Sequence, residues 1–173
     1  HITDTKSSKV PPEAIAQAVE GLKKIYETEE EMTTTLLLEI SAGAGAILGD
    51  SFGELATLLT GLGRDDVHIC LDTCHLFASG YDIRTKEALE HTMADFRKTI
   101  GIEQLKLVHM NDSKKELGSH RDLHEHMGMG EIGEKGLTAL LHHPDFQNIN
   151  FILETKHDEY ITKDIAFLKK HRS

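Results

Sequence analysis

The stretch HICLDTCH, residues 68–75, joins a strand-sized apolar run to a set of ionisable side chains. The apolar run from Val67 to Asp72 is shorter than a typical helix and ends on a carboxylate. Uninterrupted apolar runs of this length are typical of parallel strands that are covered on both faces. We therefore expect a buried strand here, with Asp72 at its carboxyl end and His75 just beyond it.

Three other apolar runs have a similar length and a similar ending. They span residues 36–40, 105–110 and 151–155, and they carry Glu39, His109 and Glu154 at or near their ends. The four runs start about 31 to 46 residues apart, with amphipathic segments before, between and after them. The alternating order of helices and strands predicts βα units that form a parallel sheet.

Start signals and apolar spacing mark the expected helices. Pro11 and Pro12 open the first helix, as proline does at a first turn. Ser51 and Glu54 have the spacing of a capping box at the second. Apolar residues then recur at helical spacing in all five segments: Ile15, Val19, Leu22 and Ile25; Leu55, Leu58 and Leu59; Leu89, Met93, Phe96 and Ile100; Leu137, Leu140 and Leu141; Ile165 and Leu168.

Composition limits the class of protein. A chain of 173 residues with 39% hydrophobic residues is long enough for one domain with a real core. The formal net charge of −10 argues against a generic basic DNA-binding protein, because non-specific DNA affinity comes from Lys and Arg. A metalloenzyme is an exception, since bound divalent ions reverse the sign of an acidic site.

The two cysteines, Cys70 and Cys74, are interpreted as reduced structural thiols of an intracellular protein. No signal peptide, apolar run long enough to span a membrane or lipidation motif is found. We therefore expect an intracellular protein without a membrane partner, located in the cytoplasm, or in the nucleus if its source is eukaryotic.

The four strand ends carry the chemistry. One ionisable residue at a strand end is usually just solvated, but four of four are ligand types here, and buried charges are costly without a partner or a metal. In a closed barrel, all four side chains would point into the mouth where active sites gather. The sequence therefore predicts a shared metal site at Glu39, Asp72, His109 and Glu154.

The glycine-rich, polar stretch 111–136 is expected to be a long loop, in which Gly128, Gly130 and Gly133 allow a close approach to another group, and it adds further candidates. Asp122 and His124, in an Asp-x-His pattern, join His75 as possible ligands, although such a pair alone is more often a surface feature. Carboxylates mixed with imidazoles suit Zn²⁺, with Mn²⁺ or Fe²⁺ as substitutes, and clustered divalent ions suit phosphodiester hydrolysis. Lys114, Lys115 and Arg121 are candidates for phosphate contact but equally for solvated surface. The glycines at 43 and 45 do not form a dinucleotide-binding fingerprint.

Longer motifs resemble those of the endonuclease IV family in order and spacing. They are LDTCHLFASGYDIRT (71–85), HMNDSKKELGSHRDLHEHMGMGEIG (109–133) and ILET (152–155), with LLEISAGAGAILG (37–49) as a weaker match. The resemblance implies a (β/α)8 TIM barrel, of which this chain is about the C-terminal half to two-thirds, with residues 1–173 as a single partial barrel domain. It also implies zinc-dependent hydrolysis of double-stranded DNA 5′ to abasic sites, as in base excision repair.

The resemblance also implies residue roles. Glu39 matches the carboxylate that bridges the first two of three zinc ions, and Glu39 and Glu154 are the expected catalytic carboxylates. Further implied ligands are Asp72, His109 and Glu154 for the second ion, and His75, Asp122 and His124 for the third. Asn111, Lys114 and Arg121 are the expected DNA contacts.

The chain departs from the family at several positions. Leu123 stands where Arg is common, Met129 where Glu is usual, and Ile40 and Ala44 replace Asn and Gln. The histidines of the first zinc site and the DNA-penetrating loops lie upstream of Glu39 in the family, and ligation by His1 is not favoured. We therefore expect a fragment with two full metal sites, impaired cleavage, and open barrel edges that favour self-association.

Two other functions remain open. A sugar isomerase or epimerase of the xylose isomerase-like group also carries Glu, Asp, His and Glu at strand ends, although it has no use for His75 with Asp122 and His124. The second alternative is a truncated barrel that binds DNA or another partner without cutting.

Overall fold

The computed structural model describes residues 11–28 and 34–172, so His1 lies outside the described residues. Four strands form one sheet in the order β1-β2-β3-β6: β1 (Leu36–Glu39), β2 (Val67–Asp72), β3 (Leu105–His109) and β6 (Asn150–Ile152). All three pairings are parallel. The expected parallel sheet of βα units is therefore confirmed.

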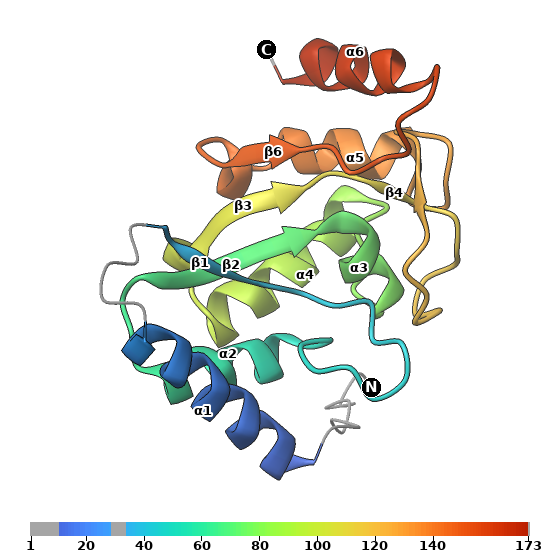
Figure 1. The fold of residues 1–173 in the computed structure, drawn as a ribbon. Coiled ribbons are helices and arrows are strands. Elements are labelled where there is room, and N and C mark those ends of the chain that lie inside the picture. The colour runs from blue at the N-terminus through green and yellow to red at the C-terminus, as the bar shows by residue number, and fades with distance from the viewer. Residues whose placement is uncertain (1–10, 29–33, 173) are drawn as a thin grey trace.

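Helices precede, separate and follow the strands of the sheet along the chain (Figure 1). They are α1 (Pro12–Thr28), α2 (Phe52–Leu62), α3 (Thr73–Ala78), α4 (Lys86–Thr99), α5 (Gly133–Leu141) and α6 (Ile161–His171), with short 3-10 helices η1 (Ile102–Gln104) and η2 (Pro144–Phe146). α1 packs on α2, α2 on α4, and α4 on α5. α6 lies above β6 as the outermost helix in Figure 1. No helix within the described ranges is both long and apolar enough to cross a membrane.

α1 begins at Pro12 and α2 is capped by Ser51, as the sequence indicated. The Ser51 hydroxyl accepts the backbone N–H of Glu54 at 3.3 Å at the start of α2. The Glu54 carboxylate is almost fully buried and accepts the N–H of Gly49 at 2.7 Å. This contact ties the loop that follows β1 to α2.

The sheet and the helices enclose one main core. Its largest buried side chains include Phe52, Phe77, Phe96 and Phe146, which lie between the strands and α2, α3, α4 and η2. Burying aromatic side chains of this size is a major source of stability for a domain. The core therefore fixes the strands, and with them the residues at the strand ends.

Three expectations need correction. Coverage of the strands on both faces holds for β2 but not for β1 or β6, whose residues are half-buried or exposed, with Ile152 47% exposed. β6 ends at Ile152, so Glu154 lies two residues beyond the strand instead of at its end. The stretch 111–136 is more ordered than a loop, because β4 (Asp112–Ser113) pairs antiparallel with β5 (His124–Glu125) and α5 begins at Gly133.

Candidate metal centre

The predicted ligands meet at one edge of the sheet. Glu39, Asp72 and His109 are the last residues of β1, β2 and β3, and the register places Asp72 beside His109. Because the strands are parallel, their carboxyl ends share this edge. Ligand atoms of Glu39, Asp72, His109 and Glu154 all lie within 4.8 Å of one another. We call these four residues the strand-end group.

The imidazole of His109 lies at the middle of the strand-end group. Its Nδ1 is 3.2 Å from Glu39 Oε1 and 3.0 Å from Glu154 Oε2. The two glutamates therefore meet at the same ring nitrogen, although they come from opposite edges of the sheet. Their side chains are 35% and 41% exposed, so the group is open to solvent on this side.

Asp72 is the closed end of the strand-end group. It is fully buried, its Oδ1 accepts the backbone N–H of His75 at 2.8 Å, and its Oδ2 accepts the side-chain amide of Asn111 at 2.6 Å. The first of these bonds also caps α3, which explains why this short helix begins directly after β2. Burial raises the pKa of Asp72 above its ordinary value.

Asn111 has a different place from the one expected. It is fully buried, and its Oδ1 accepts the backbone N–H of Glu154 at 2.9 Å while its amide donates to Asp72. Its backbone N–H donates to the Thr73 hydroxyl at 2.8 Å. The expectation that Asn111 contacts DNA is therefore wrong for this structure, because the side chain has no exposed surface and links two ligand-bearing segments instead.

The loop candidates form a second cluster beside the first. His75 lies on α3, Asp122 precedes β5 and His124 begins β5, and their ligand atoms also lie within 4.8 Å of one another. Asp122 Oδ1 is 3.1 Å from His75 Nε2 and 3.2 Å from His124 Nε2. We call these three residues the loop group. It adjoins the strand-end group, since His124 Nε2 is 3.5 Å from Asp72 Oδ2.

The orientation of the two imidazoles fits a metal ion. His75 Nδ1 faces the carbonyl oxygen of Ile40 at 3.0 Å, and His124 Nδ1 faces the carbonyl oxygen of Glu154 at 3.1 Å. In a neutral ring, such a carbonyl holds the N–H at Nδ1 and leaves the lone pair on Nε2. The two Nε2 atoms are only 3.4 Å apart, beside Asp122. Two lone pairs and a carboxylate oxygen that converge in this way are a donor set for a cation.

The electrostatics agree with that interpretation. Burial by itself would lower the pKa of His75, but Glu39, Asp72 and Asp122 outweigh it and raise that pKa to about 9. Burial would raise the pKa of Glu39, but hydrogen bonds and charge from His75 and His109 outweigh it and lower that pKa. A proton on His75 therefore compensates part of the negative charge, which is the task that a divalent cation performs in a loaded centre.

The cysteines lie near the centre but have the chemistry of structural thiols. Both are free and buried, although each lies within reach of two of the candidate ligands. Burial raises the pKa of Cys70 to about 12 and that of Cys74 to about 11. Only the thiolate is a strong ligand, so this shift favours the carboxylates and imidazoles.

Asp112 anchors the segment that carries the loop group, and sequence reasoning missed it. Its buried carboxylate accepts backbone N–H groups from Ser113 at 2.8 Å, Gly130 at 3.0 Å and Ile132 at 3.0 Å. A Cβ on Gly130 would lie 2.3 Å from the carbonyl oxygen of Ser113, so only glycine fits. The expected close approach of this glycine segment is therefore to Asp112 and Ser113. An aspartate three residues after a strand-end ligand was the available signal.

The basic candidates lie at the surface. Lys114 and Arg121 are exposed, and Lys114 Nζ is 4.0 Å from Glu125 Oε2. Three of the four departures from the family pattern are also exposed: Ala44, Leu123, which is 41% accessible, and Met129, which is 58% accessible. The surface around the loop group therefore carries exposed apolar side chains next to positively charged ones.

Comparison with known proteins shows the family of this chain. The family described as a xylose isomerase-like TIM barrel matches residues 2–171. The chain belongs to this family. A relative from Halothermothrix orenii, named probable endonuclease 4, is 42% identical over 157 residues, which are 89% of this chain and 55% of that protein.

Solved structures agree with the barrel class. An endonuclease IV from Thermus thermophilus has a TM-score of 0.77 at 32% identity. The match covers 90% of this chain and 58% of the endonuclease chain. An L-ribulose 3-epimerase has a TM-score of 0.57, and the match covers 96% of this chain and 54% of the epimerase chain. Because the identity is only 19%, this likeness shows the fold alone.

These findings confirm the TIM-barrel class and the resemblance to endonuclease IV. The chain spans about half the length of the curated relatives that it matches.

Proposed function

We propose that this chain is the C-terminal part of an endonuclease IV-type enzyme that hydrolyses DNA 5′ to abasic sites with zinc. The observation that carries the proposal is the convergence of the strand-end group and the loop group at one edge of the sheet. Relatives at about 40% identity that are named probable endonuclease 4 support it. The sugar isomerase alternative has no comparable support, because the epimerase likeness extends to the fold only.

Metal ions supply the main chemistry when they are bound: they polarise phosphate oxygens and lower the pKa of water. The residues supply position and access. Asp72 is buried and cannot reach a substrate, so its role is to hold the floor of the centre. Glu39 and Glu154 are partly exposed and both contact Nδ1 of His109, and we assign them the catalytic positions next to the phosphate.

Charge makes the centre depend on cations. Four carboxylates gather at the two groups, and the whole chain carries a formal net charge of −10. A DNA phosphate brought to such a site would be repelled unless cations reverse the local sign. We therefore propose two ligand sets in this chain, which would take Zn²⁺, or Mn²⁺ or Fe²⁺ as substitutes, and Glu39 would also be available to a further ion.

The proposal includes double-stranded DNA as the partner, with Lys114 and Arg121 on its phosphates, in an intracellular protein. Within residues 11–28 and 34–172, the edge strands β1 and β6 each pair on one side only. Strand edges of this kind favour pairing with further strands, so self-association and weakened activity of this chain alone belong to the proposal.

Cleavage of a duplex with one synthetic abasic site tests the function. We expect metal-dependent cutting 5′ to the lesion that is lost after treatment with EDTA and returns with Zn²⁺. Asp65→Asn is a control variant that should cut like the parent, because it removes only an exposed carboxylate outside the centre. Bound metal without cutting would support a truncated, non-catalytic barrel, and a chain that neither binds metal nor cuts would contradict the proposal.

A further inference from the structure

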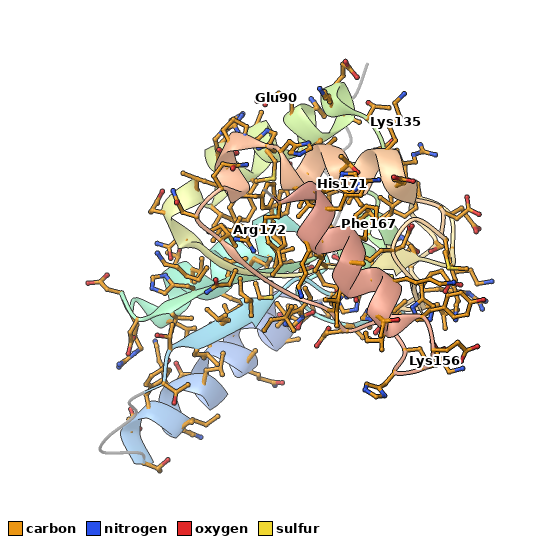
Figure 2. The ribbon with its side chains drawn as sticks, turned by 90° about the horizontal axis from the view of Figure 1, so that it is seen from above. Glu90, Lys135, Lys156, Phe167, His171 and Arg172 are labelled. Carbon is orange, nitrogen blue, oxygen red and sulfur yellow. The ribbon has the colours of Figure 1, made fainter. Side chains whose placement is uncertain are left out.

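Outside the two ligand groups, one buried cluster connects the C-terminal helix to the centre. Asp164 lies in the first turn of α6 and is only 2% exposed. Figure 1 shows α6 above β6, and Figure 2, seen from above, shows it crossing the molecule with His171 near one end and Lys156 near the other. A carboxylate at this depth is costly unless donors surround it.

Three donors meet the Asp164 carboxylate. Its Oδ2 accepts Nδ1–H of His126 at 2.7 Å and the Thr155 hydroxyl at 2.7 Å. Its Oδ1 accepts the backbone N–H of Met127 at 2.9 Å. Both oxygens are therefore occupied, which makes this carboxylate a rigid connection between three segments.

Each donor lies next to a metal-ligand candidate. His126 and Met127 follow His124 by two and three residues, and Thr155 follows Glu154 directly. These two segments meet again inside the centre, where His124 Nδ1 faces the carbonyl oxygen of Glu154 at 3.1 Å. The segment that carries His124 and the segment that carries Glu154 therefore contact each other at two points. Asp164 lies at the second of them.

We infer that Asp164 is a positioning residue that fixes the loop group relative to the strand-end group. The inference rests on the proposed metal centre and deepens it. Neither His124 nor Glu154 is held by strand pairing in the main sheet: Glu154 lies beyond β6, and His124 belongs to the two-stranded β4-β5 ribbon. Asp164 supplies the constraint that the sheet does not.

The substitution Asp164→Asn tests this role with little change in volume. The amide cannot accept at both positions, so its NH₂ group would face either Met127 or the pair His126 and Thr155. The matched control is Asp158→Asn, because Asp158 is the other carboxylate on His126, at 3.2 Å from Nε2, but contacts neither Thr155 nor Met127 in the described contacts.

The readout is Co²⁺ binding by the whole chain, followed by visible absorption and equilibrium dialysis, with thermal melting of the metal-free protein alongside. We expect Asp164→Asn to weaken Co²⁺ binding by about 10- to 100-fold and to change the absorption spectrum. Asp158→Asn should keep the parent's affinity and spectrum. Thr155→Val, which removes one donor, should weaken binding in the same direction by a smaller factor.

The outcomes separate the two ideas. A lower melting temperature of Asp164→Asn with unchanged Co²⁺ affinity and spectrum would overturn the positioning role and leave only a structural one. If Asp164→Asn does not fold, Thr155→Val decides, and parent-like Co²⁺ binding by that variant would overturn the inference. A parent chain that binds no Co²⁺ would overturn the proposed centre itself, and the positioning of its ligands with it.

Discussion

The strand-end group and the loop group differ in what holds their ligands. Asp72 and His109 are paired in neighbouring strands, and Asp72 is fully buried. Asp122 has a side chain that is 57% exposed, and its segment is held by side-chain anchors such as Asp112. Backbone pairing in the main sheet fixes Glu39, Asp72 and His109, whereas Glu154 and the loop group depend on buried carboxylates that are not themselves ligands. Substitutions in the two groups should therefore have different effects.

The largest effect is expected from Asp72→Asn. This variant removes the buried ligand. We expect cleavage of abasic DNA to fall by about 100-fold or more, because loss of a residue that only supports a metal ligand already costs up to about 100-fold. Burial raises the pKa of Asp72, but the new amide would turn its NH₂ group toward the N–H of His75 or the side-chain amide of Asn111, so the metal-free variant should melt lower than the parent. Metal analysis and calorimetry check both points, and full metal content would contradict the assignment.

Asp122→Asn should affect the loop group alone. We expect one bound metal ion fewer, with the strand-end group still loaded, because Asp122 is shared by His75 and His124 only. The free energy of unfolding of the metal-free chain should change by no more than about 0.5 kcal/mol, as for other exposed positions. Metal stoichiometry and urea titration measure this, and loss of all metal would show that the groups are not separable.

Gly130→Ala tests the anchor of the loop. Its Cβ would meet the Ser113 carbonyl oxygen at 2.3 Å, so we expect a loss of about 1–3 kcal/mol in the free energy of unfolding. Gly53→Ala is the control, because nothing lies within 4 Å of its Cβ in α2, and it should stabilise the chain by about 0.5–1 kcal/mol. Urea denaturation measures the free energy of unfolding of both variants. Equal changes in the two variants would contradict the role of Gly130 in anchoring the loop.

The smallest effect is expected from Lys114→Ala. Lys114 is exposed near the loop group, so its loss should weaken duplex binding about equally for all sequences and reduce the slope of log K against log salt by about 1. Lys98→Ala on α4 is the control, because Lys98 lies just before the amino end of β3, away from the strand carboxyl ends. Binding titrations at several salt concentrations measure the slope, and equal slopes for both variants would place DNA elsewhere.

The sequence predicted the elements better than their limits. Three of four strands ended where an ionisable residue follows an apolar run, because alternation between buried and polar character is local information. The end of β6 was misplaced, since FILET remains apolar up to Glu154 while its pairing with β3 stops at Ile152. α3 was missed because its start depends on the Asp72 carboxylate, which the sequence suggested only as a ligand.

For the site, the sequence by itself determined which residues could be ligands, because carboxylate and imidazole chemistry is a property of the residue type. It also indicated that four strand ends would meet, since parallel strands have no other arrangement. Only the tertiary structure decided which residues support those ligands. Asn111 joins Asp72 to Glu154, and Asp164 joins the segments of His124 and Glu154. Such contacts depend on residues distant in sequence, and no local pattern encodes the distance between them.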